Sequence, residues 1–131
     1  MTALIDAGTT VRVCDLTELE VERGRAALIG ERQVALFLLS DGHVHAVSNL
    51  DPYSGAHVIS RGIVGSRGDA PTVASPLHKQ VFDLRTGRCL ETQGKPDAAL
   101  QVWPVRVIDG VVHVEMSQDG IGDGGSRGAI G

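Results

Sequence analysis

Short apolar stretches separated by turn residues run along most of the chain. Two of them flank Asp41-Gly42: residues 33–39 form a strongly apolar run, and residues 43–48 alternate between polar and apolar side chains. Asp-Gly between two such runs is typical of a β-hairpin. The first run therefore predicts a strand buried on both faces, and the second predicts a strand with one exposed face.

Further short β-prone segments follow at regular intervals, with glycine-containing turns between them. The remaining strand candidates are residues 11–14, 25–29, 63–64, 72–74, 81–84, 88–90, 100–108 and 111–115. No convincing helical period is present, and residues 16–25 hold at most a short turn. This pattern predicts an all-β fold, an antiparallel β-sandwich or small barrel.

The length of the chain fits one domain with a glycine-rich end. Of the 131 residues, 17 are glycine, and six of these lie in residues 117–131. A segment so rich in glycine loses much backbone entropy on ordering. We therefore expect one domain over residues 1–116 and a flexible tail over residues 117–131.

The composition excludes several classes of function. A net charge of −4 disfavours nucleic acid as a partner, and no apolar run is long enough to cross a membrane. The first residues lack the basic and apolar regions of a secretion signal, so we expect a cytoplasmic protein. In that compartment Cys14 and Cys89 are expected to be free, buried thiols.

Two loop segments carry the most specific pattern in the sequence. The first is Asn49-Leu50-Asp51-Pro52, and the second is Ser75-Pro76-Leu77-His78-Lys79-Gln80, followed by the hairpin segment Phe82-Asp83-Leu84-Arg85-Thr86-Gly87. Asn, Asp and Ser side chains accept hydrogen bonds from nearby backbone N–H groups and stabilise tight loops. Ser75 has no evident base and acid beside it in the sequence, which favours a turn-forming role over that of a nucleophile.

In this order the two loops resemble the cluster-binding loops of Rieske domains. Those domains bind a [2Fe–2S] cluster through Cys-x-His on one loop and Cys-x-x-His on the other. The corresponding positions here are Asn49, Asp51, Ser75 and His78, so only His78 keeps the type of a ligand. The resemblance implies a Rieske-like iron–sulfur-protein (ISP) domain whose former cluster-binding tip binds no metal. We expect hydrogen bonds from Asn49, Asp51 and Ser75 to join the loops instead.

The pattern is more closely similar to the small subunit of NAD(P)H-dependent assimilatory nitrite reductase. The shared positions are Asn49, Asp51, Pro52, Ser60, Arg61, Gly62, Ile63, Ala74, Ser75, Pro76, Lys79 and Gln80. The resemblance implies an accessory subunit, non-catalytic alone, of a complex that reduces nitrite to ammonium in nitrate assimilation. It implies that FAD, an iron–sulfur cluster and sirohaem belong to a large-subunit partner, and that this chain binds no cofactor.

The loop end offers a candidate docking face for that partner. Tyr53 and Leu77 supply apolar surface, and Arg61 and Lys79 supply cations for a rim. Three alternatives stay open at this point: a Rieske-type [2Fe–2S] electron-transfer protein, a repurposed non-catalytic Rieske-like binding module, and self-association into a homo-oligomer through exposed strand edges.

Overall fold

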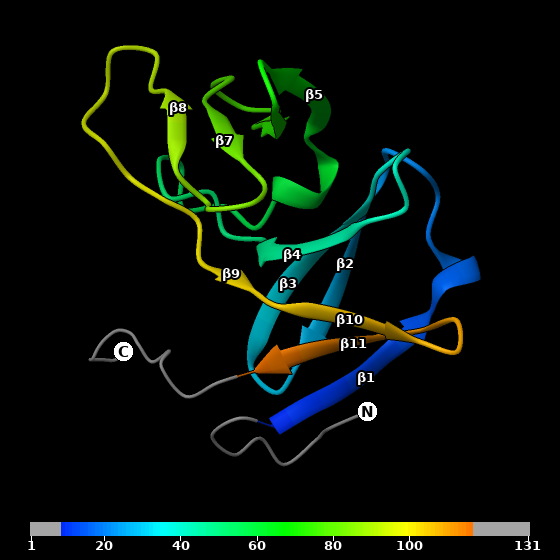
Figure 1. Cartoon of the computed structure of the whole chain (residues 1–131). Helices are drawn as coiled ribbons and strands as arrows, with labels where there is room; N and C mark the ends of the chain where they lie inside the picture. Colours follow the sequence, from blue (N-terminus) through cyan, green and yellow to red (C-terminus); the bar gives the residue numbers. More distant parts are fainter. Residues whose placement is uncertain (1–8, 117–131) are drawn as a thin grey trace.

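The computed structural model describes residues 9–116, and the predicted glycine-rich tail lies outside them. This part of the chain forms three antiparallel sheets and two short 3₁₀-helices (Figure 1). The strands are β1 (Thr9–Asp15), β2 (Gly24–Ile29), β3 (Arg32–Leu38), β4 (Val44–Ser48), β5 (Ile63–Arg67), β6 (Ala70–Ala74), β7 (Val81–Asp83), β8 (Cys89–Glu91), β9 (Val102–Trp103), β10 (Val105–Ile108) and β11 (Val111–Met116). The 3₁₀-helices are η1 (Leu16–Glu18) and η2 (Ile59–Arg61). The all-β, antiparallel prediction is confirmed.

The sheet β2-β3-β4-β9 lies at the centre of the fold, with β1-β11-β10 and β5-β6-β7-β8 as the other two sheets. Along β3, Val34 and Leu36 belong to a core shared with β1 and β11, while Ala35 and Phe37 belong to a second core shared with β6 and β7. Successive side chains of a strand point to opposite faces. The prediction that this run is buried on both faces is therefore confirmed.

The prediction of an exposed face for residues 43–48 is wrong. Val44 and Ala46 enter the first core, and Val47 is fully buried in the second. The reason is that a core packs on each face of the central sheet, one shared with β1 and β11 and the other with β6 and β7. Alternation in the sequence does not reveal such packing by segments distant along the chain.

Two other elements differ from the sequence prediction. The β5–β6 hairpin is longer than expected, with Gly68 in the left-handed conformation (φ 60°) at its turn. The predicted strand at residues 100–108 divides at Pro104: Trp103 pairs with Ala46 in the central sheet, and Val105 pairs with Val114. Because proline has no N–H to donate to a ladder, it favours the change of sheet at this point. Within residues 9–116, no helix is long and apolar enough to cross a membrane.

Gly24→Ala tests how closely η2 packs against the central sheet. A Cβ at Gly24 would lie 2.1 Å from the Ser60 carbonyl oxygen and 2.8 Å from the Phe37 ring. We expect the variant to lower the free energy of unfolding in urea by about 1–3 kcal/mol, the usual range for overpacking. Gly65→Ala is the matched control, because its nearest neighbour, Thr72 Oγ1, lies at 3.5 Å. Equal stability of the two variants would contradict this packing.

Candidate functional site

The two motif loops meet at one end of the fold, which we call the tip: residues 49–58 between β4 and η2, and residues 75–80 between β6 and β7. The Ser75 hydroxyl donates a hydrogen bond to Asp51 Oδ2 at 2.6 Å, and both side chains are fully buried. Hydrogen bonds to a charged acceptor are shorter and stronger than neutral ones. This single contact joins the two loops across 24 positions of the sequence.

The other carboxylate oxygen of Asp51 serves the first loop. Asp51 Oδ1 accepts hydrogen bonds from the backbone N–H groups of Tyr53 at 2.9 Å and Ser54 at 3.4 Å. Burial alone raises the pKa of Asp51, but the hydrogen bonds from Ser75, Tyr53 and Ser54 outweigh burial and hold that pKa below its ordinary value. The carboxylate is therefore stabilised in its charged form.

Asn49 was expected to help join the two loops, but its side chain has other partners. Its Oδ1 accepts a hydrogen bond from the Ser60 N–H at 2.7 Å, and its Nδ2 donates to Gln33 Oε1 and to the His57 carbonyl, both at 3.3 Å. Asn49 thus fastens the first loop to β3 and η2. The hydrogen bonds of its side chain do not reach the second loop.

The second loop is closed mainly by Ser75. Its N–H donates to the Gln80 carbonyl at 2.9 Å, its carbonyl accepts from the Lys79 N–H at 3.1 Å, and its Oγ accepts from the Leu77 N–H at 3.3 Å. Lys79 takes the left-handed conformation, with φ 65°. His78 lies exposed on this loop, outside the buried pair of Asp51 and Ser75.

The donor set does not fit a Rieske cluster. Such a cluster needs two thiolates and two imidazoles, whereas these positions offer an amide, a carboxylate, a hydroxyl and one imidazole. The first three groups are already used in the hydrogen bonds described above. Cys14 and Cys89 are free and buried as predicted, but they lie on β1 and β8, not on the loops. Residues 9–116 contain no group of three or more His, Cys, Asp or Glu side chains arranged for a metal ion.

The predicted docking residues occupy two regions. Leu77 (48% exposed) and Lys79 lie on the second loop, and the half-buried Tyr53 ring packs against Phe82 with centroids 6.1 Å apart. Arg61 belongs to η2 and lines a separate hollow beside β2. Whether these residues form an interface stays a prediction.

A third segment, residues 92–98, completes the tip, and the sequence did not indicate its position. The Tyr53 hydroxyl donates to the Pro96 carbonyl at 2.8 Å, which ties this segment to the first loop. Burial, followed by a hydrogen bond with Cys89, raises the pKa of Tyr53 to about 12, so the phenol stays a donor. Gly94 and Pro96 signalled a loop here, but no local signal pointed to its partner in the fold.

Ser75→Ala tests whether the buried hydrogen bond holds the tip together. The variant leaves Asp51 Oδ2 buried without this donor, so we expect the free energy of unfolding to fall by about 1.5–3 kcal/mol. The control is Thr86→Ala, which removes a local hydrogen bond from the Arg88 N–H at an exposed position away from the tip and is expected to change stability by less than about 0.5 kcal/mol. Urea unfolding measures the stability of both variants. Similar losses of unfolding free energy would contradict a particular role for the hydrogen bond between Ser75 and Asp51.

Asp51→Asn tests the charge on the carboxylate through pH. Because the folded-state pKa of Asp51 lies below its ordinary value of 3.8, its stabilisation is complete above that value and is lost as the pH falls through the lowered pKa. The stability difference between wild type and variant should therefore be constant from about pH 7 to about pH 5 and shrink as the pH falls below about 4. The lowered pKa values of Asp83 and Glu91 are common to both proteins and cancel in the difference. A constant difference would contradict the assignment.

Three relatives resemble the chain, two of them by sequence and one by structure as well. The Escherichia coli nitrite reductase (NADH) small subunit is 37% identical over 103 residues, which cover 78% of this chain and 93% of that protein. A crystal structure assigned as the NADH-dependent nitrite reductase small subunit of Mycobacterium tuberculosis superposes with a TM-score of 0.76 at 44% identity, over 82% of this chain and 95% of that one.

The third relative is a larger protein. The chain is 44% identical over 106 residues, 81% of its length, to a nitrite reductase [NAD(P)H] large subunit of Klebsiella oxytoca, of which it spans 11%. The family model for the Rieske-like [2Fe-2S] domain matches residues 9–115. With the antiparallel fold and the two loops of the tip in place, this chain belongs to the Rieske-like domain family and, within it, to the nitrite reductase small subunits.

Proposed function

We propose that this chain is the accessory small subunit of a cytoplasmic NAD(P)H-dependent nitrite reductase of nitrate assimilation, which binds the large subunit and carries no electrons itself. In this proposal FAD, an iron–sulfur cluster and sirohaem belong to the large subunit and supply the reduction of nitrite to ammonium. The observation that carries the proposal is the buried hydrogen bond from Ser75 to Asp51, because it uses two of the four positions at which a Rieske domain has ligands.

The Klebsiella relative supports binding to a large subunit. A segment 44% identical to this chain lies within a single polypeptide named as a nitrite reductase large subunit. Two domains that share one chain in one organism and form separate chains in another are expected to work in contact. The contribution of the small subunit is then to stabilise and orient its partner.

The proposed cytoplasmic location is supported by the free state of the two cysteines. Cys14 and Cys89 are both free and buried, and neither contributes to a disulfide. Unpaired cysteines are usual in a reducing compartment.

Co-expression with the large subunit tests the proposed function. Produced alone, the large subunit should be less stable to heat and should oxidise NAD(P)H more slowly in the presence of nitrite, because a surface made for binding is left uncovered. Adding the purified chain should restore both properties. Equal stability and turnover with and without the chain would remove the proposal.

A further inference from the structure

A hollow of about 660 Å³ lies at the tip, between the two motif loops and the segment of residues 93–98. Its walls are fixed by hydrogen bonds between these segments: the Tyr53 hydroxyl donates to the Pro96 carbonyl at 2.8 Å, and Gln93 Nε2 donates to the Lys79 carbonyl at 3.1 Å. A surface that is already formed before binding loses little conformational entropy when a partner arrives. The hollow is therefore suited to receive a protein segment.

Gln80, which lines this hollow, carries a buried acceptor without a hydrogen-bond partner. Its side chain lines the hollow and is only 1% exposed, and its Nε2 donates to the Thr92 carbonyl at 3.4 Å. Its Oε1 accepts no hydrogen bond from residues 9–116. A buried polar atom without a partner costs about 1–3 kcal/mol. Because this oxygen is shielded from solvent, Gln80 forms part of the wall of the hollow and is not an accessible contact for a partner.

Part of the lining is apolar and lies beside more apolar surface. Pro52, Pro96, Ala98 and the Tyr53 ring line the hollow, and the neighbouring Leu77 is 48% exposed. Apolar and aromatic groups at the centre of a concave surface are typical of binding sites for a projecting side chain.

Cations border this apolar centre although the chain as a whole has a net charge of −4. Arg67 on β5 and Arg85 in the turn after β7 are neutralised by ion pairs with Glu91 and Asp83. Lys79 and Lys95, in contrast, form no ion pair with any residue between 9 and 116.

His78 adds an imidazole to the lining of the hollow, and Asp97 contributes a carboxylate there. The rim with its two lysines is complementary to a partner surface that carries carboxylates. A second copy of this chain would bring the same lysines together, which disfavours self-association at the tip.

We propose that the hollow receives a projecting segment of the nitrite reductase large subunit, with an apolar side chain at its centre and acidic residues beside it. The inference rests on the proposed function and adds the place of contact.

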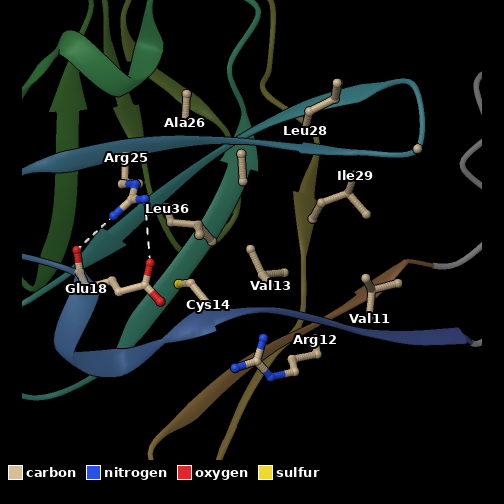
Figure 2. Close-up of a pocket in the computed structure, with 12 residues that line it drawn as sticks. Val11, Arg12, Val13, Cys14, Glu18, Arg25, Ala26, Leu28, Ile29 and Leu36 are labelled. Carbon is tan, nitrogen blue, oxygen red and sulfur yellow. Dashed lines mark hydrogen bonds and ion pairs between the residues drawn. The ribbon is translucent and has the colours of Figure 1, made fainter. Parts of the chain in front are cut away.

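The hollow at the seam between β1 and β2 is a weaker site for this purpose. It is smaller, about 310 Å³, Cys14 and Leu36 are among its lining residues, and the ion pair of Arg25 with Glu18 lies at one end of it (Figure 2).

Binding of the purified chain to the large subunit, measured by titration calorimetry, tests the contact. Ala98→Trp fills the hollow and Lys95→Glu reverses the charge of its rim, and each should weaken binding about tenfold or more. The matched controls are Ala26→Trp at the seam and Arg106→Glu on β10, both at exposed positions. These should change the affinity by less than about twofold. Because Lys95 is exposed, its variant is expected to fold normally, whatever Ala98→Trp does to stability.

The possible outcomes distinguish the proposed docking site at the tip from the proposed function as a subunit. Loss of binding in the two tip variants alone, with weaker salt dependence in Lys95→Glu, supports the inference. If wild type binds and the tip variants bind equally well, or if Ala26→Trp abolishes binding instead, the contact lies elsewhere while the proposed function stands. Failure of wild type itself to bind the large subunit overturns both.

Discussion

A carboxylate and a hydroxyl, 2.6 Å apart and shielded from water, hold the two loops of the tip together. Burying the charge of Asp51 is costly, and three donors offset that cost: the Ser75 hydroxyl and the N–H groups of Tyr53 and Ser54. Metal bonds join the corresponding loops in a cluster-bearing domain. Here three of the same positions, Asn49, Asp51 and Ser75, are used by hydrogen bonds within the protein, and these bonds hold the loops in place.

The loops of the tip keep a fixed geometry because they are supported by a central sheet whose strand β3 is buried on both faces. Strand β3 contributes Leu36 to one core and Phe37 to the other. The Phe37 ring also lies close to Gly24, against which η2, the element that follows the first loop, packs. Asn49 ties that loop to Gln33 at the start of β3. Loops supported by a rigid core keep their geometry without a ligand, which is what a docking surface requires.

Local sequence patterns were sufficient for some of these features and insufficient for others. The apolar run at residues 33–39 indicated two buried faces, and the polar groups of Asp51 and Ser75 indicated loops held by hydrogen bonds. The pairing of β4 with β9, the division of a strand at Pro104 and the choice of Gln33 as a partner of Asn49 depend on residues distant in sequence. The burial of Gln80 could not be predicted for the same reason, because the segments that pack over its side chain are not linked to it by any local sequence pattern.

Iron and acid-labile sulfide, assayed together with the visible absorption spectrum on protein isolated without oxygen, test most directly whether hydrogen bonds have replaced the cluster at the tip. The expected result is that neither element is present in stoichiometric amount and that no visible band bleaches on reduction. Stoichiometric iron and sulfide with a reducible chromophore, lost on substitution of residues in the two loops, would contradict it.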